Sequence, residues 1–254
     1  MILVLAGTQD GRELAARLAD DGYPIILSVV SEYGKQIACQ QKMRVIAGGL
    51  DRKAMERLIR DEAVKLIIDA SHPYAAAVSQ NAMQAAAQTN ILYLRYERPE
   101  VALPDYEKLW LADSPVEAAR KAASLGRIVF LTTGSRTLDV YKQEAALQEC
   151  RLIARVLPDS EVIAECARLG FAPRDIVAMQ GPFSVELNKE LFRSFGTEVV
   201  ISKNSGEIGG TDTKLAAAIE LGIHLVMIGR PPVSYTRKVD SQAAVLRYLE
   251  EVYS

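Results

Sequence analysis

The segment at positions 202–214, SKNSGEIGGTDTK, combines glycines with lysine, asparagine, serine and threonine side chains. It follows an apolar run at 199–201 and precedes the helical pattern LAAAIELG. A glycine-rich loop at the carboxyl end of a strand can turn backbone N–H groups toward an anion. The segment therefore predicts an anion-binding site; the alternative is a long turn whose glycines serve backbone geometry alone. The residues expected to bind are Lys203, Asn204, Ser205, Gly206, Gly210, Thr211 and Lys214.

A second candidate lies after the first apolar run, where Gly7, Thr8 and Gly11 precede a helical pattern. A glycine turn at a helix N-terminus suits a dinucleotide pyrophosphate, because the backbone can approach it and the helix dipole favours negative charge. The spacing departs from the G-x-G-x-x-G pattern. A plain strand-to-helix turn capped by Thr8 or Asp10 is the alternative.

The end of the second apolar run is where a dinucleotide-binding fold contacts the adenosine ribose. Ser31, Tyr33 and Lys35 occupy this place. Serines and Lys35 suit the 2′-phosphate of NADPH, whereas Glu32 suits the ribose hydroxyls of NADH. The composition favours NADPH slightly over NADH.

The stretch after the fourth run reads Asp69, Ala70, Ser71, His72, Pro73, Tyr74. Pro73 restricts His72 to extended geometry, which predicts that the imidazole and the Tyr74 ring lie at the strand end. Ser71, His72 and Pro73 are expected to contact the cofactor, and His72 and Tyr74 are candidates for proton transfer. The alternative is a helix cap formed by Ser71 and His72.

Three further residues end strand-like runs in the second half of the chain. Thr133 and Ser135 lie in the turn TTGSR, and Arg230 follows the last run. A guanidinium can fork onto a carboxylate, so Arg230 is a candidate substrate contact, with a surface ion pair as the alternative.

The composition excludes several classes of function. The chain has 254 residues, a formal net charge of −2 and only two histidines, His72 and His224. This charge supplies no general attraction for nucleic acid, and no clustered ligand pattern indicates a metal. Three widely spaced cysteines and no long apolar segment predict a cytoplasmic protein without a membrane span. We expect a monomer or a weak homo-oligomer.

Short apolar runs alternate with helical patterns, which predicts an α/β fold with two Rossmann-like domains whose mostly parallel sheets face each other across a cleft. Proline-rich residues 99–114 are expected to link a dinucleotide-binding domain, 1–98, to a substrate-binding domain, 115–254. Asp51 and Ser114 are expected helix N-caps, and Gly22, Gly126 and Gly196 are expected at helix C-termini. The expected strands span 2–6, 24–30, 43–47, 65–70, 91–95, 127–133, 150–156, 175–180, 198–202 and 224–229.

Five segments together resemble the precorrin-6A reductase family of cobalamin biosynthesis: LAGTQDGRELA, DASHPYA, TTGSR, SKNSGEIGGTDTKLAAAIELGI and VMIGRPP. The resemblance spans essentially the whole chain. It implies an NADPH- or NADH-dependent reductase that transfers a hydride to carbon 19 and a proton to carbon 18 of precorrin-6A, or of its cobalt-bearing form, giving precorrin-6B.

The resemblance also implies that the cofactor binds the amino-terminal domain and that the tetrapyrrole lies in the interdomain cleft. Basic groups would then hold its acetate and propionate chains. The runner-up interpretations are a transferase acting on a nucleotide or sugar phosphate through 202–214, and a nucleotide sensor without turnover.

Overall fold

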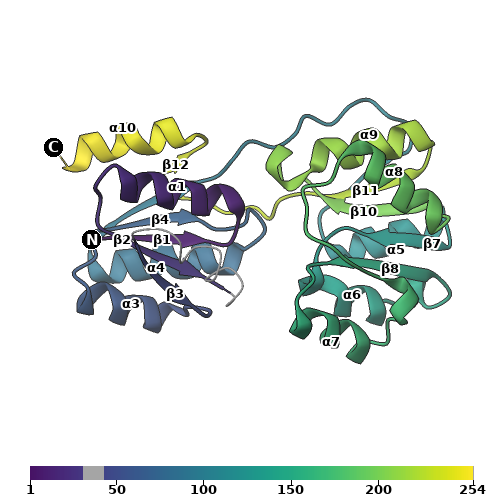
Figure 1. Cartoon of the computed structure of the whole chain (residues 1–254), viewed down its shortest axis with the longest axis horizontal. Coiled ribbons are helices and arrows are strands. Elements are labelled where there is room, and N and C mark those ends of the chain that lie inside the picture. Colours follow the sequence, from purple (N-terminus) through teal and green to yellow (C-terminus); the bar gives the residue numbers. More distant parts are fainter. Residues whose placement is uncertain (31–42, 254) are drawn as a thin grey trace. The chain divides into compact units, whose positions relative to one another are not determined.

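The computed structural model describes residues 1–30 and 43–253, in which strands and helices alternate along the chain (Figure 1). They form two compact units: residues 1–99 with 231–254, and residues 100–230. Within the described ranges, no helix is long and apolar enough to cross a bilayer.

The first unit is built on a six-stranded sheet with the order β12-β5-β4-β1-β2-β3. All of its strand pairs are parallel. Its elements are β1 (Ile2–Ala6), α1 (Gln9–Asp20), β2 (Ile25–Val29), β3 (Arg44–Ala47), α3 (Arg52–Asp61), β4 (Leu66–Ala70), α4 (Ala76–Thr89), β5 (Leu92–Tyr96), β12 (Lys238–Val239) and α10 (Gln242–Tyr253).

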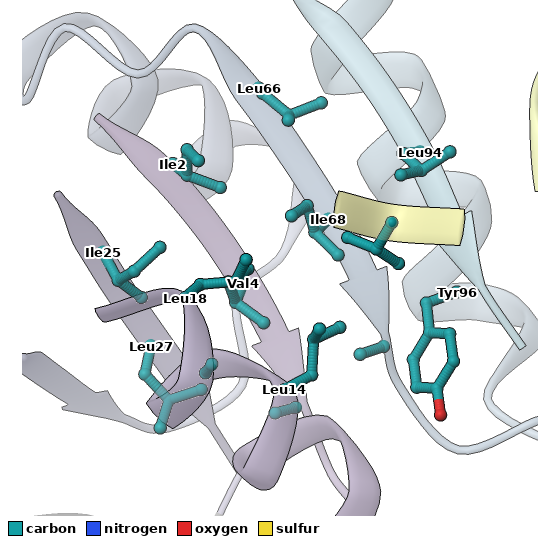
Figure 2. Close-up of a cluster of buried hydrophobic side chains, with 14 of the residues drawn as sticks. Ile2, Val4, Leu14, Leu18, Ile25, Leu27, Leu66, Ile68, Leu94 and Tyr96 are labelled. Carbon is teal, nitrogen blue, oxygen red and sulfur yellow. The ribbon is translucent and has the colours of Figure 1, made fainter. Parts of the chain in front are cut away.

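Helices cover both faces of this sheet. Side chains of α1 and α10 pack on one face with alternate residues of β1, β2 and β4, and side chains of α3 and α4 pack on the other. Figure 2 shows the first of these cores, where Val4 and Ile68 lie near Leu14 of α1. Burial on both faces explains why most residues of the central strands are apolar.

The second unit repeats this plan with the strand order β6-β11-β10-β7-β8-β9, again parallel throughout. Its main elements are β6 (Leu109–Ala112), α5 (Pro115–Leu125), β7 (Ile128–Leu131), α6 (Leu138–Gln143), β8 (Arg151–Val156), α7 (Ser160–Arg168), β9 (Ile176–Ala178), α8 (Val185–Ser194), β10 (Val199–Lys203), α9 (Thr211–Leu221) and β11 (His224–Ile228).

The predicted α/β class with parallel sheets is confirmed, and each of the ten expected strands is present. Two further strands, β6 and β12, were not expected. The run of β6 is short and lies among prolines, and β12 has two residues, so neither produces a recognisable apolar pattern.

The units do not follow the expected boundaries of 1–98, 99–114 and 115–254. The stretch expected to be a linker contributes β6, which pairs with β11. Residues 231–254, expected in the second domain, belong to the first unit, because β12 pairs with β5 and Val245 and Leu249 are fully buried in its core.

Helix ends mostly match the sequence expectations. Asp51 accepts a hydrogen bond from Ala54 N (2.7 Å), and Ser114 accepts one from Glu117 N (3.2 Å). Gly22 and Gly196 adopt positive φ. The expectation for Gly126 was wrong in its geometry: φ is −177°, and a Cβ at this position would lie 2.7 Å from Glu198 Cβ. Close approach to β10 therefore requires glycine there.

Candidate functional site

The strand order of the first sheet reverses between β1 and β4, which are hydrogen-bonded neighbours. Ligands of doubly wound sheets bind at such a reversal, beyond the carboxyl ends of the two strands. Gly7 and Thr8 follow β1, and Ser71 to Tyr74 follow β4. The structure brings these two predicted segments together: a Cβ on Gly7 would lie 3.8 Å from His72 N, and Thr8 Oγ1 donates to Ala70 O (3.4 Å).

The two glycines of the first turn differ in their surroundings. Gly7 is exposed, whereas Gly11 is buried in the first turn of α1. A Cβ on Gly11 would lie 2.7 Å from Ala70 O and 3.1 Å from Ala6 Cβ. Gly11 thus permits α1 to pack closely on the sheet, and Gly7 is the glycine whose backbone a ligand can approach.

The start of α1 fits an anion. Thr8 is its N-cap, but within the described chain its side chain makes no capping hydrogen bond to this helix. Asp10, the other expected cap, accepts a hydrogen bond from Arg98 (2.6 Å), and both side chains are buried. The interpretation as a side-chain-capped turn is therefore wrong, and the helix dipole remains directed toward the turn at Gly7.

The loop after β4 has a defined histidine geometry. Tyr74 N donates to His72 Nδ1 (3.2 Å), and the two rings lie 5.6 Å apart between centroids. Because Nδ1 accepts this bond, the neutral imidazole carries its hydrogen on Nε2. Helix α4 begins later, with Ala75 as its N-cap, so the alternative of a cap formed by Ser71 and His72 is not supported.

A buried ion network contacts this loop through Ser71. Arg95 and Asp69 have no exposed side-chain surface, and Arg95 Nη1 donates to Asp69 Oδ1 (2.9 Å) and to Ser71 Oγ (3.1 Å). Arg95 Nη2 donates to Glu97 Oε2 (2.9 Å), and Tyr93 donates its hydroxyl to Asp69 Oδ2 (2.8 Å). Burial, with the nearby Asp69 charge, raises the pKa of Tyr93, which keeps the phenol neutral.

This network was not expected from the sequence. Its signal was a charged residue inside each of two apolar strands, Asp69 in β4 and Arg95 in β5. The strands are adjacent and register Asp69 with Arg95. Opposite charges at paired positions of two buried strands indicate an ion pair that can hold the adjacent loop in place.

The second sheet reverses its strand order between β7 and β10. Thr133 and Ser135 follow β7, and the 202–214 segment includes the end of β10. Lys203 Nζ donates to Thr133 O (2.8 Å), while Thr132 Oγ1 donates to Ile201 O (3.0 Å). The structure therefore places the predicted residues of these two segments at one sheet edge.

Several polar side chains of the 202–214 segment hold the loop itself. Asn204 bonds to both backbone groups of Val101 (2.9 and 3.0 Å). Thr211 Oγ1 accepts from Ser205 N (3.0 Å) and donates to Lys203 O (3.2 Å). Gly206 and Gly210 have positive φ values, 80° and 65°, which lets the chain turn between β10 and α9.

Arg230 lies beside this loop. Its Nε donates to Asn204 O (3.1 Å) and lies 3.3 Å from a half-exposed Glu100 carboxylate. The structure thus includes the ion pair that was the alternative for Arg230.

The two lysines of the segment differ from surface lysines. Burial, reinforced by Arg136, lowers the pKa of Lys203 to about 8. Burial, reinforced by Arg155 and Lys203, lowers the pKa of Lys214 to about 7. Lys214 Nζ donates to Gly209 O (3.1 Å). Two buried or half-buried basic side chains therefore lie in this segment of the second sheet. Ser31, Tyr33 and Lys35 lie outside the described residues.

Comparison with known proteins identifies the family. Residues 1–250 match the family described as precorrin-6x reductase CbiJ/CobK. The cobalt-precorrin-6A reductase of Priestia megaterium is 40% identical over 236 residues, which cover 92% of each chain. That of Salmonella typhimurium is 38% identical over 251 residues, covering 98% of this chain and 95% of the relative.

A solved structure agrees with these relatives. CobK precorrin-6A reductase superposes with a TM-score of 0.81 at 29% identity, covering 98% of this chain and 96% of that one. These similarities support an oxidoreductase and not the transferase considered from the sequence. The chain belongs to the precorrin-6x reductase family.

Proposed function

We propose that this chain reduces the cobalt-bearing form of precorrin-6A with a reduced nicotinamide cofactor. The cobalt form is favoured because the Priestia and Salmonella relatives are named for it. The proposal rests on the two places where the strand order reverses, which we call switch points. In one unit this place carries an exposed glycine turn at a helix N-terminus, and in the other it carries buried lysines.

The cofactor's pyrophosphate is assigned to the turn formed by Gly7 and Thr8, where the N-terminus of α1 favours negative charge. Ser71, His72 and Pro73 form the neighbouring wall. Gly11 is assigned to the same turn, and its missing Cβ also allows α1 to pack on β4. When bound, the reduced nicotinamide supplies the hydride.

The preference between NADPH and NADH is assigned to Ser31, Tyr33 and Lys35, with NADPH favoured by the positive charge of Lys35. Lys35→Glu should lower kcat/KM for NADPH relative to NADH. An unchanged ratio would mean that the ribose phosphate is recognised elsewhere.

The chain's own residues hold and orient the bound ligands and supply the proton. The neutral His72 ring can donate a hydrogen bond from Nε2 to a bound ligand, and the protonated ring can supply a proton to it. The backbone N–H of Tyr74 orients the neutral ring. His72 and Tyr74 are therefore proposed as the proton-transferring groups. The conjugated macrocycle accepts the electrons itself, so positioning dominates the protein's contribution.

The 202–214 segment, with Thr133, Ser135 and Arg230, is proposed to hold the carboxylates of the macrocycle. Lys203 and Lys214 supply positive charge, and Ser205, Gly206 and Gly210 shape the backbone around it. Asn204 and Thr211 contribute by fixing the loop.

The test is an anaerobic turnover assay with precorrin-6A and its cobalt form, each with NADPH and NADH. We expect cofactor oxidation only when a tetrapyrrole is present, and higher kcat/KM for the cobalt form. Cofactor binding without oxidation in all four combinations would contradict the proposed reaction. Faster turnover of the metal-free form would contradict the choice of substrate.

A further inference from the structure

Arg155, near the end of β8, is a buried arginine that no sequence motif singled out. Its relative exposure is 7%, and among the described residues no carboxylate lies within ion-pair distance of it. Its guanidinium lies over the Phe183 ring at 4.3 Å, and Nη1 donates to Asn188 Oδ1 (2.7 Å). One hydrogen bond leaves most of the five N–H donors of an arginine for another acceptor.

Arg155 lies close to the 202–214 segment. Asn188, which accepts its hydrogen bond, donates through Nδ2 to Thr213 Oγ1 (3.4 Å) in the first turn of α9. Thr213 precedes Lys214, whose relative exposure is 5%. The charge of Arg155 contributes to the lowered pKa of Lys214, as does that of Lys203, whereas Asp212 acts in the opposite direction. Arg155 and two buried or half-buried lysines therefore gather where the strand order of the second sheet reverses.

A buried guanidinium such as that of Arg155 is costly without an anion. Moving a charge out of water is unfavourable unless a counter-charge or several hydrogen bonds replace the solvent. Phe130 and Phe183 provide only the faces of aromatic rings. The planar guanidinium fork of Arg155 matches the geometry of a carboxylate, because it can donate two parallel hydrogen bonds.

We propose that Arg155, Lys203 and Lys214 form a buried anion subsite that binds one carboxylate side chain of the substrate. The identity of the ligand as a tetrapyrrole carboxylate rests on the proposed function. The carboxylate chemistry of the subsite does not, and it can be tested with a small carboxylate.

The subsite is tested with the variant Arg155→Met, because an unbranched apolar side chain can pack against the neighbouring Phe130 and Phe183 rings. The matched control is Arg151→Met on the same strand, where Arg151 forms a half-exposed ion pair with Asp175 at the other end of β8. The probe is citrate, added to the full-length protein against chloride of equal ionic strength, with thermal unfolding as the readout.

Citrate should raise the Tm of the wild type and of Arg151→Met, and the increase should be largely absent in Arg155→Met. Without citrate, Arg155→Met should be at least as stable as the wild type, because a buried unpaired charge has been removed. Lower stability without citrate, together with an unchanged citrate effect, would show a structural role and overturn the proposal. No citrate effect on the wild type would also overturn it.

A turnover assay tests whether the subsite binds the tetrapyrrole substrate. Arg155→Met should raise the KM for the tetrapyrrole about 10-fold or more, as expected for a lost charge-assisted hydrogen bond, while cofactor affinity stays unchanged. If citrate binds at Arg155 but the wild type does not reduce the tetrapyrrole, the proposed function fails and the anion subsite stands. If the wild type turns over and KM is unaffected by Arg155→Met, the subsite assignment fails alone.

Discussion

Individual side chains of the first unit are fixed by the ion network of Asp69, Arg95 and Glu97. Arg95 has no exposed side-chain surface and joins the two carboxylates to Ser71 of the candidate cofactor loop. Removing one member of a buried network leaves the other charges uncompensated, which costs more than the network contributes as a whole.

Arg95→Ala should therefore reduce the free energy of unfolding by about 3–5 kcal/mol. Tyr93→Phe removes only the hydrogen bond to Asp69 and should cost about 1.5–3 kcal/mol. Urea unfolding measures both. Arg44→Ala is the control, since the Arg44–Glu62 pair is partly exposed and should change stability by about 1 kcal/mol or less. Equal effects of Arg95→Ala and Arg44→Ala would show that the network does not stabilise the folded state.

Lys214 should make stability depend on pH in a defined direction. Burial, with the charges of Arg155 and Lys203, lowers its pKa to about 7, from 10.5 in an exposed lysine. Between these values the unfolded chain binds the proton and the folded chain has released it, so this group makes the folded state more stable as pH rises.

Urea unfolding between pH ~7 and ~9 should show this increase in the wild type and a smaller one in Lys214→Met. Affinity for a carboxylate should change the other way, falling as the lysine loses its charge. Identical pH dependence of unfolding in the wild type and Lys214→Met would show that Lys214 titrates as an ordinary lysine.

At the scale of elements, the turn between β1 and α1 separates two functions of glycine. A Cβ on Gly7 would meet only His72 N at 3.8 Å, an ordinary contact, whereas a Cβ on Gly11 would meet a backbone oxygen at 2.7 Å. From its sequence position Gly11 is a cofactor contact; the packing of α1 on the sheet gives it a structural role.

Gly11→Ala should therefore lower stability by about 1–3 kcal/mol, because the helix must move away from β4. Gly7→Val should leave the Tm nearly unchanged and weaken cofactor binding. Thermal unfolding and cofactor titration of both variants test the distinction. Wild-type cofactor affinity in a folded Gly7→Val protein would contradict the pyrophosphate assignment.

For the whole molecule, the last helix belongs to the unit formed by the start of the chain. Leu249 of α10 is fully buried in the core of the first unit, with Val245 and Tyr248 beside it. Leu249→Ala should lower the stability of this unit by about 2–5 kcal/mol.

Hydrogen exchange should accordingly accelerate in α1 and β5, and residues 100–230 should keep their protection. Val252→Ala, at a side chain 36% exposed, is the control and should have little effect. Faster exchange confined to residues 100–230 would contradict the division of the chain.

The sequence by itself determined the repeated strand and helix pattern, because the central strands are buried on both faces and most of their residues are apolar. It also placed Gly7, His72 and Lys203 at the ends of strands. The tertiary structure decided which strand ends are neighbours. Four features join residues that are distant in the chain. Asp69 pairs with Arg95, Gly11 approaches Ala70, α10 packs in the first unit, and Arg155 lies near Lys214. Such contacts depend on strand order and register, which no local pattern of residues specifies.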